Sequence, residues 1–571
     1  MGVGWLSGRP SSHKSRPRLI HPMRRFLCPF LLAFLPLALL GAQPADSRPN
    51  IVFIFADDWG RYAGSYAELD GPGTVNDLLR GRTPNIDRVA REGALFRRAF
   101  VSAPSCTPSR SALLSGQHFW RTGRGAILRG AVWDPAIPSY PLLLRDAGYH
   151  IGETYKVWSP GRPDDAPYGG GDYRYEAAGR RFNTFSQNVT RLVREGAALE
   201  SAKQALYAEV RGNFDAFLER RPAGQPYCYW FGPTNVHRTW IRGSGAALWG
   251  LNPDDLKGRM PPFLPDVPEV REDLADYFGE ILALDAAVGV LLRRLEEQGE
   301  LDSTLVVISG DHGAPGFPYG KCNLYDFGSA VPLLLRGPGV AAGTVVDDLT
   351  SLTDLAPTFL DVAGIPAPAT MTGRSLQPLL AAGASGRGEP AGDAVFIGRE
   401  RHVESARDGY LPYPQRAIRT RDHLLIINFE PDRWPIGEPY RLEGDNPPTV
   451  EQLTTQTRVT LPDEDAGPTK AWMVTHRNDP QWKPYFERAY GKRPRLELYD
   501  LAKDPHQMAN VAGQPAYAAI EAALERRLRD ELLRTGDPRV IDGGRFFETP
   551  PLSGPTDDGG GQSPEELRRG G

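Results

Sequence analysis

Four side chains with metal-binding atoms follow two apolar runs of the sequence. Asp57 and Asp58 come directly after the run Ile51–Ala56, and Asp311 and His312 come after the run STLVVISG. Two buried carboxylates side by side repel each other, and a divalent cation removes that conflict. Oxygen ligands of this kind suit calcium or magnesium, and the imidazole can add a nitrogen. The Asp-Asp pair alone is more simply a strand end at the surface, but both sets together predict a site for Ca²⁺, or for Mg²⁺.

A lone cysteine, Cys106, lies in SAPSCTPSRSALLSG, Ser102 to Gly116, where a helix is expected to begin. Thr107 can cap this helix, and Pro108 suits its first turn. The N-terminus of a helix offers free N–H groups and the positive end of its dipole, so it favours anions. Arg110, about one helical turn on, can hold oxygens with its planar guanidinium.

Three further side chains suit an oxyanion site. Lys156 follows the strand-like segment YHIGET, Lys321 lies in YGKCNLYD, and His237 lies in NVHRTW. Each has an ordinary alternative, because a lysine or histidine in a loop is usually solvated. Together with the cation and the helix they predict a site that holds a tetrahedral or trigonal oxyanion, with His237 as acid or base.

The elements that must position these residues alternate between strands and helices. Apolar runs such as IVFIFA, YHIGET, PYCYWFG, STLVVISG and VPLLLR indicate strands. Segments such as TPNIDRVAREG, SYPLLLRDAG and the long EVREDLADYFGEILALDAAVGVLLRRLEEQG indicate helices. This order predicts an α/β domain with a mainly parallel sheet. Ligands of such sheets bind beyond the carboxyl ends of the strands, where the two acidic pairs are expected to meet.

The pattern changes after about Pro390. AVFIGRE and QRAIRTRDHLLIIN read as antiparallel strands with Arg421 and Asp422 at the turn, and PAYAAIEAALERRLRDELLRTG reads as a helix. We therefore predict a catalytic domain over 48–390 and a smaller C-terminal α+β domain with an antiparallel sheet over 391–545. The polar, glycine-rich end, 546–571, is predicted to be disordered.

Residues 1–42 are predicted to be an export signal that starts at Met23. A basic stretch, Met23–Arg25, precedes the apolar stretch Phe26–Leu40, and small residues offer a cleavage point after Ala42. The apolar stretch is too short to span a bilayer comfortably, so no stable membrane span is expected. The protein is then periplasmic or secreted. A net charge of -4 argues against nucleic acid as a partner, and the sequence leaves open whether Cys228 and Cys322 pair.

A set of motifs, in order along the chain, resembles the type I, formylglycine-dependent sulfatase family. CTPSRSALLSG matches the pattern Cys (or Ser)-x-Pro-x-Arg followed by a small, helical tail. NIVFIFADDWG, TPNIDRVAREG, SGDHG, YGKCNLYDFGSAVPLLLRGPG and LELYDLAKDPHQMAN also resemble blocks of this family, and the resemblance runs from Arg48 to about Val511. It implies an alkaline-phosphatase-like sandwich, built on a large mixed, mainly parallel sheet.

The resemblance also implies a mechanism for the lone cysteine. In the family this residue is oxidised to formylglycine by a maturation enzyme during export. One hydroxyl of the aldehyde hydrate attacks sulfur, and the second later loses its proton as sulfate is expelled. The implied metal ligands are Asp57, Asp58, Asp311, His312 and the modified residue 106. The other implied catalytic residues are Arg110 for the diol, Lys156 and Lys321 for sulfate oxygens, and His237 with Lys321 for the leaving group.

The chain departs from the family pattern at two positions. Many sulfatases have Gly-Lys-x-His after the strand that supplies the first lysine, and Trp158 stands where that histidine would lie. Thr234 replaces the first histidine of the common His-x-Pro-His segment. The sequence therefore does not say which group deprotonates the diol.

The segment Gly398 to Pro435 is predicted to shape substrate choice. Its charged residues suit a sulfated saccharide, and His402-x-Glu404 followed by YPQRAIRT resembles the heparan N-sulfatase (sulfamidase) branch. A solvated charged loop is an equal reading by composition. The predicted substrate-binding residues are Arg399, His402, Glu404 and Arg416. Two alternatives to a glycan sulfatase stay open, a phosphonate or phosphate ester hydrolase of the same superfamily and a catalytically silent glycan-binding relative.

Overall fold

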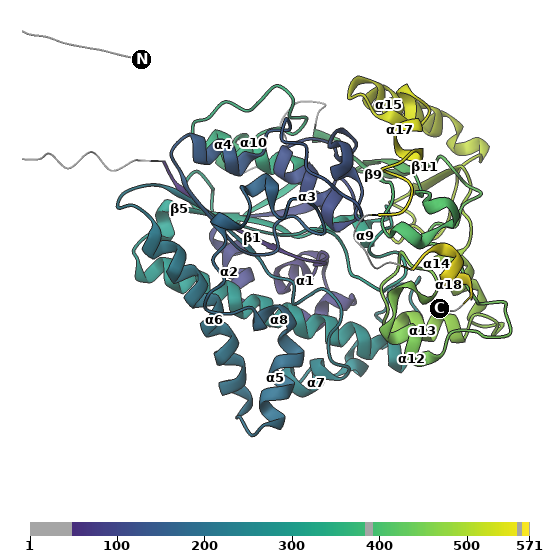
Figure 1. Cartoon of the computed structure of the whole chain (residues 1–571), viewed down its shortest axis with the longest axis horizontal. Helices are drawn as coiled ribbons and strands as arrows, with labels where there is room; N and C mark the ends of the chain where they lie inside the picture. Colours follow the sequence, from purple (N-terminus) through teal and green to yellow (C-terminus); the bar gives the residue numbers. More distant parts are fainter. Residues whose placement is uncertain (1–47, 383–391, 557–561, 570–571) are drawn as a thin grey trace, which may run out of the picture. The chain divides into compact units, whose positions relative to one another are not determined.

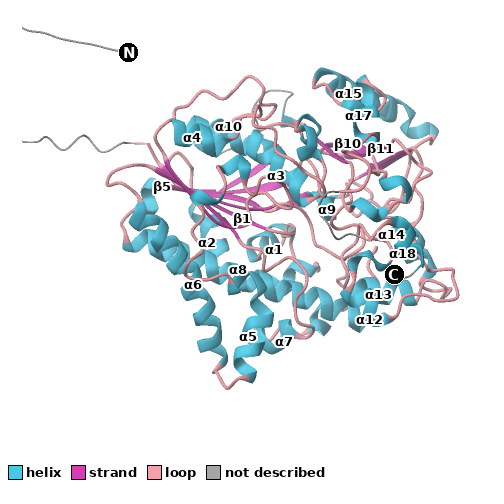
Figure 2. Ribbon diagram, viewed as in Figure 1, coloured by secondary structure: helices cyan, strands magenta, loops and turns pink. Residues whose placement is uncertain are grey.

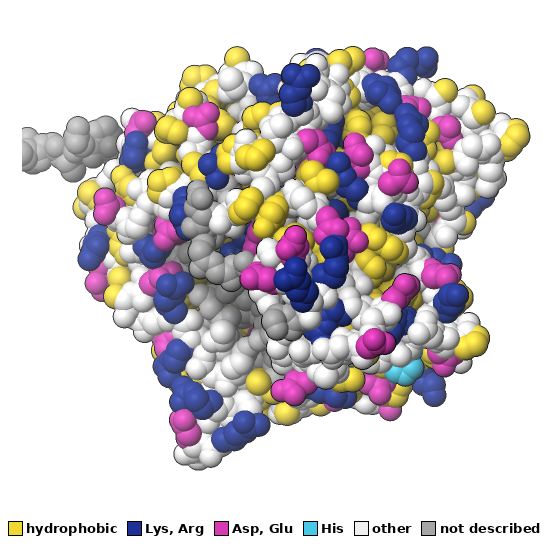
Figure 3. Space-filling view, turned by 45° about the vertical axis from the view of Figure 1, so that its right-hand side comes forward, with side chains coloured by type: hydrophobic (Ala, Val, Ile, Leu, Met, Phe, Trp, Pro, Cys, Tyr) yellow, Lys and Arg dark blue, Asp and Glu magenta, His cyan; other side chains and the backbone are white. Residues whose placement is uncertain are grey.

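The computed structural model describes residues 48–382, 392–556 and 562–569 (Figure 1). The predicted export signal, 1–42, lies outside the described residues, and so does the predicted domain boundary near residue 390. Among the described helices, none combines the length and the apolar character that a membrane crossing requires. On the face drawn in Figure 3, basic and acidic side chains are interspersed, in keeping with the small net charge of -4.

A large mixed sheet of eight strands forms the centre of the N-terminal part, as the sequence predicts. Its order is β3-β4-β1-β5-β7-β2-β6, and β8 pairs with β2. The neighbours from β3 to β5 run parallel, whereas β7 is antiparallel to both β5 and β2. The strands are β1 (Asn50–Ala56), β2 (Ala94–Phe100), β3 (His150–Tyr155), β4 (Tyr227–Gly232), β5 (Thr304–Gly310), β6 (Ala330–Val331), β7 (Leu333–Arg336) and β8 (Thr344–Ser351).

Helices cover both faces of this sheet (Figure 2). Alternate residues of β1 pack on opposite faces, Val52 and Ile54 toward one helical layer and Phe53 and Phe55 toward the other, which explains why the strand is apolar throughout. The first layer contains α1 (Gly64–Asp70), α2 (Pro84–Glu92), α5 (Phe185–Arg194), α6 (Leu199–Arg220), α7 (Ser244–Trp249) and α8 (Pro268–Glu297). The second contains α3 (Cys106–Ser115), α4 (Tyr140–Asp146), α10 (Leu355–Val362) and α11 (Gln377–Ala382), and the short α9 (Asp326–Ser329) precedes β6.

The C-terminal part contains the predicted antiparallel sheet, in the order β12-β11-β10-β9. Its strands are β9 (Ala394–Arg399), β10 (Gln415–Thr420), β11 (His423–Asn428) and β12 (Leu496–Asp500), with Arg421 and Asp422 at the predicted turn. Its helices are α12 (Val450–Thr455), α13 (Pro468–Thr475), α14 (Lys483–Tyr490), α15 (Ala518–Arg534), α16 (Pro538–Ile541), α17 (Arg545–Glu548) and α18 (Pro564–Arg569). Leucines of α15 pack with Ile418 and Leu425 of the sheet and with Phe119 and Trp120 of the N-terminal part.

The structure revises the prediction for the C-terminal tail and answers the question that the sequence left open about two cysteines. The prediction of a disordered tail over 546–571 is wrong for the described part, because Phe547, Leu552 and Leu567 are buried and the tail includes α18. These apolar side chains pack although the surrounding composition is polar. Cys228 and Cys322, whose pairing the sequence leaves open, are both buried free thiols.

Arg416 lies inside the C-terminal part rather than at a substrate surface. Its side chain is fully buried, with Nη2 donating to Glu400 Oε1 at 2.9 Å and to Asp537 Oδ1 at 3.0 Å. These contacts do not support its predicted role in substrate binding, because carboxylates engage Nε and Nη2 and the backbone carbonyls of Arg399 and Gln415 engage Nη1.

We expect Arg416→Ala to lower the free energy of unfolding by about 3–5 kcal/mol, since it leaves two buried carboxylates with fewer partners. Denaturant unfolding followed by circular dichroism measures this loss. The matched control is Arg421→Ala at the exposed turn of the same hairpin, which should change stability by less than about 0.5 kcal/mol. Unchanged stability with a raised KM would instead assign Arg416 to the substrate site.

Candidate active site

The two acidic pairs meet at the carboxyl ends of β1 and β5. These strands are parallel neighbours with Ala56 opposite Gly310, so the residues that follow them are adjacent. The backbone N–H of Asp58 donates to Asp311 Oδ1 at 2.8 Å, and His312 Nε2 lies 3.2 Å from Asp58 Oδ1. The strand register thus brings together the four residues that the sequence selects as metal ligands.

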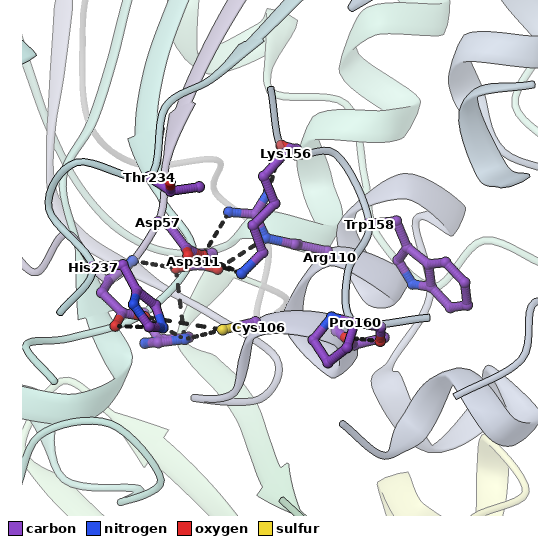
Figure 4. Close-up of polar contacts among 12 residues, drawn as sticks. Asp57, Cys106, Arg110, Lys156, Trp158, Pro160, Thr234, His237 and Asp311 are labelled. Carbon is purple, nitrogen blue, oxygen red and sulfur yellow. Dashed lines mark hydrogen bonds and ion pairs between the residues drawn. The ribbon is translucent and has the colours of Figure 1, made fainter. Parts of the chain in front are cut away.

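Cys106 is the first residue of α3 and points into this cluster (Figure 4). Its Sγ lies 3.4 Å from His312 Nε2 and 4.0 Å from Asp58 Oδ1. Burial raises the pKa of the Cys106 thiol far above its usual value, so an unmodified thiol is a poor nucleophile here. Thr107 does not cap the helix as the sequence suggests: Ser105 is the N-cap residue, and the Thr107 hydroxyl donates to the Pro160 carbonyl at 2.7 Å.

Arg110 holds the carboxylates in place from the same helix. Its Nε donates to Asp311 Oδ2 at 2.9 Å and its Nη2 to Asp57 Oδ1 at 3.0 Å. Its Nη1 donates to the carbonyls of Lys156 and Val157. The guanidinium is fully buried, so its charge acts on residue 106 through the carboxylates that it orients.

The two lysines approach the cluster from separate loops. Lys156, directly after β3, places Nζ 2.8 Å from both oxygens of Asp57. Lys321 places Nζ 3.2 Å from Asp58 Oδ2 and 3.4 Å from His237 Nε2. His237 is one-third exposed, so it borders the opening of the site.

The donor set fits a divalent cation that prefers oxygen. Side-chain ligand atoms of Asp57, Cys106 and Asp311 lie within 4.8 Å of one another, as do those of Asp58, Cys106 and His312. Burial and the neighbouring Asp57 charge raise the pKa of Asp311 above its usual value. Burial would also raise the pKa of Asp57, but Lys156 and Arg110 hold it well below its usual value. Carboxylates that repel one another, together with one imidazole, suit Ca²⁺ or Mg²⁺ better than a soft metal.

The predicted substrate-binding residues other than Arg416 are also largely buried. Arg399 is engaged by Asp463 and by the carbonyls of Cys322 and Pro435. Glu404 forms an ion pair with Arg458 at 2.8 Å, in which the arginine is 26% exposed. These contacts hold the side chains of Arg399 and Glu404 within the protein and do not present them at an open surface of the site.

His402 supports the start of the nucleophile helix. Its Nδ1 lies 2.8 Å from the Ser105 hydroxyl, which precedes Cys106. Burial, together with the charge of Lys321, lowers the pKa of His402 well below its usual value, so the ring is neutral. The structure therefore places His402 behind the nucleophile position rather than against a bound saccharide.

Sequence reasoning missed Asp465, whose Oδ2 lies 3.2 Å from Lys321 Nζ. It belongs to the segment LPDEDAGP, which carries no motif and lies far from the other site residues in sequence. Asp465 comes close to Lys321 only because the C-terminal part of the chain packs against the carboxyl ends of the strands of the large sheet. The excess of acidic residues in a short proline- and glycine-bounded stretch was the one available signal.

The two departures from the family pattern have a structural explanation. Trp158 is fully buried, and its indole N–H donates to the Ser111 hydroxyl at 2.8 Å. An indole N–H is a donor only, so Trp158 does not accept a proton from residue 106. Trp158, Thr234 and Lys156 line a cavity of about 260 Å³ with Arg180. Figure 4 shows Trp158 turned away from Cys106.

Comparison with known proteins agrees with this geometry. The family model described as Sulfatase matches residues 49–365. The chain belongs to the sulfatase family. This sulfatase is therefore a hydrolase of the sulfuric ester class, and its large mixed sheet with a second, antiparallel sheet is the fold of its structural neighbours.

Relatives of this sulfatase include several enzymes named for glycan substrates. Human N-sulphoglucosamine sulphohydrolase is 30% identical over 540 residues, which cover 90% of this chain and 95% of the relative. An N-acetylglucosamine-6-O-sulfatase of Bacteroides thetaiotaomicron is 26% identical, with 72% and 85% covered. A solved structure described in complex with its substrate D-glucosamine-2-N,6-O-disulfate has a TM-score of 0.55 at 20% identity, covering 86% of this chain and 98% of that chain.

We expect Asp57→Asn to weaken binding of Ca²⁺ by more than about 100-fold. Loss of a residue that only supports a metal ligand costs up to about 100-fold, and Asp57 is itself expected to be a ligand. The amide keeps the side-chain shape but removes the charge shared with Lys156 and Arg110. Isothermal titration of the metal-free protein with Ca²⁺ measures the affinity. Asp172→Asn, at an exposed carboxylate after β3, is the matched control and should bind Ca²⁺ like the wild type. Equal affinity in both variants would place the cation elsewhere.

Proposed function

We propose that this sulfatase is exported, that Cys106 is converted to formylglycine, and that the mature enzyme removes sulfate from a sulfated glycan. The observation that carries the proposal is the position of Cys106, at the start of α3 and against three buried carboxylates and two lysines. An unmodified thiol with a raised pKa has little use there, whereas an aldehyde hydrate offers a hydroxyl. A formylglycine-generating maturation enzyme is the implied partner.

The proposed roles of the side chains follow from their contacts. The formylglycine hydrate supplies the attacking hydroxyl, and a cation held by Asp57, Asp58, Asp311 and His312 supplies positive charge beside it when bound. Lys156 and Lys321 bind sulfate oxygens, because their ammonium groups lie on either side of the aspartate pair. His237, 3.4 Å from Lys321 Nζ, donates a proton to the leaving nitrogen or oxygen as its bond to sulfur breaks. Arg110 keeps Asp57 and Asp311 oriented.

The proposed substrate is a heparan-type saccharide, with N-sulfoglucosamine ahead of O-sulfated sugars. The support is the 30% identity to human N-sulphoglucosamine sulphohydrolase over nearly the whole chain. The relative named N-acetylglucosamine-6-O-sulfatase keeps O-sulfated glucosamine as the second choice. A phosphonate monoester hydrolase from Silicibacter pomeroyi shares the fold, with a TM-score of 0.54 at 19% identity, so phosphonate and phosphate esters belong in the test.

Export of the protein to the periplasm or outside the cell is proposed from residues 1–42 of the sequence. A relative named as an extracellular sulfatase, from Drosophila melanogaster, is 28% identical over 377 residues. It covers 59% of this chain and 31% of that relative.

We expect natively exported protein to carry formylglycine at residue 106. Peptide mass spectrometry of the segment around CTPSR identifies the aldehyde, and Cys106→Ala serves as the inactive control. Because Cys106→Ala removes a single side-chain atom at the start of a helix, this variant should keep its thermal unfolding midpoint within a few degrees while losing sulfate release. Full activity in protein that contains only unmodified cysteine would contradict the proposed nucleophile.

We expect the mature enzyme to release sulfate from N-sulfated glucosamine faster than from 6-O-sulfated glucosamine. Free sulfate is measured for both saccharides and for an aryl sulfate, and release of the aryl alcohol is measured for an aryl phosphate and an aryl methylphosphonate. Release from the O-sulfated sugar alone would reject the N-sulfate assignment and keep the sulfatase. Activity on the aryl sulfate with none on either sugar would remove the support for a glycan substrate.

A further inference from the structure

Asp465 lies where the C-terminal part of the chain reaches the cluster around Cys106. Its Oδ2 is 3.2 Å from Lys321 Nζ, and the same ammonium group is 3.2 Å from Asp58 Oδ2. Lys321 is therefore shared between a carboxylate at the end of β1 and one from the C-terminal part. The side chain of Asp465 is 16% exposed, and the Oδ2 atom that faces Lys321 is buried.

The backbone around Asp465 is held firmly against the catalytic part. Arg238 donates to both oxygens of Asp273, at 2.9 and 2.7 Å. The Thr469 hydroxyl donates to the same carboxylate at 2.6 Å. A Cβ atom on Gly467 would overlap the Arg238 guanidinium, so the chain passes directly over this group. Asp465 is thus preorganised, and its charge has a fixed position relative to Lys321.

The Asp465 carboxylate is ionised. Burial alone would raise its pKa, but the charges of Lys321 and His237 hold the pKa below its usual range. A permanent negative charge beside a sulfate-binding lysine repels an anionic substrate. It favours selectivity only where the other groups of the site carry an excess of positive charge. The effect of Asp465 therefore depends on the charges of the neighbouring groups.

Without Asp465, the aspartate, lysine and arginine side chains joined around residue 106 balance one another. Three carboxylates face one guanidinium and two ammonium groups, namely Asp57, Asp58, Asp311, Arg110, Lys156 and Lys321. Asp465 adds one negative charge and a divalent cation adds two positive charges. The loaded site is therefore one charge less positive with Asp465 than without it, whichever protonation state His237 has.

This difference separates two classes of substrate. A sulfate ester or sulfamate carries one negative charge, and so does a phosphonate monoester. A phosphate monoester has its second pKa near about 6 and carries close to two negative charges above neutral pH. Loss of one negative charge from the site strengthens the attraction for the dianion about twice as much as the attraction for a monoanion.

We propose that Asp465 sets the charge selectivity of this site, favouring monoanionic sulfo groups over dianionic phosphate monoesters. The proposal rests on the proposed function, because the count includes the divalent cation. It assigns Asp465 a role in specificity that no motif of the sequence marks. The effect depends on the charge of the carboxylate, so an isosteric amide removes it and a longer carboxylate keeps it.

The first test compares wild-type enzyme with Asp465→Asn and Asp465→Glu at pH 8. The substrates share one aryl leaving group and are an aryl sulfate, an aryl methylphosphonate and an aryl phosphate. In Asp465→Asn we expect the ratio of kcat/KM for phosphate to that for sulfate to rise at least about tenfold, as loss of one nearby charge implies. The phosphonate-to-sulfate ratio should stay within about threefold, and Asp465→Glu should resemble the wild type. Asp445→Asn, at an exposed carboxylate of the same part of the chain, is the matched control.

The second test measures binding without turnover. Protein that retains Cys106 unmodified is titrated calorimetrically with the aryl phosphate and the aryl sulfate in the presence of Ca²⁺. We expect the ratio of the two Kd values to move toward phosphate at least about tenfold in Asp465→Asn, and to stay unchanged in Asp445→Asn.

The outcomes separate the inference from the proposed function. Equal changes for all three substrates with an unchanged Kd ratio would make Asp465 a structural partner of Lys321 and overturn the inference. A shifted Kd ratio, together with no hydrolysis of sulfate esters by protein that carries formylglycine at residue 106, would contradict the proposed function and support the charge selectivity.

Discussion

Burial of carboxylates at the ends of β1 and β5 is the constraint on which the site depends. Water cannot solvate Asp57 and Asp311 there, so each must be met by a positive charge within the protein. Arg110 meets both, and that requirement fixes the position of α3 against the sheet. Since Cys106 begins the same helix, the arginine that neutralises the aspartates also places the nucleophile position beside them. The packing of one helix and the geometry of the chemistry therefore have a common cause.

The C-terminal part takes part in this electrostatic balance and does more than cover the site. Asp463 engages the guanidinium groups of Arg399 and Arg407, and it accepts from the backbone N–H of Val403 at 2.9 Å. Two residues further on, Asp465 meets Lys321. One short acidic segment thus joins the fold of the second sheet to the charge of the catalytic cluster, and a change in either is expected to affect the other.

Trp158, which departs from the family pattern, is accommodated by packing and by one hydrogen bond. The indole is buried, and its N–H is satisfied by Ser111 of α3, so it contributes packing at the position where the family pattern has a histidine. The side of the site near Thr234 and Lys156 is correspondingly open as a cavity of about 260 Å³. His237 and Lys321, whose nitrogens lie 3.4 Å apart, are groups near residue 106 that can take part in proton transfer.

The sequence by itself determined the mixed α/β sheet, the antiparallel second sheet and the cluster of Asp57, Asp58, Asp311 and His312, because apolar runs mark the strands and the strand ends must meet. It did not determine which charged residues of the C-terminal part face the site. Arg416 and Asp465 have equally polar surroundings in sequence, yet one is enclosed by two carboxylates and the other reaches Lys321. Local patterns report on the strand or helix that contains a residue, whereas partners hundreds of residues away are chosen by how the two sheets pack, and only the tertiary structure decides that.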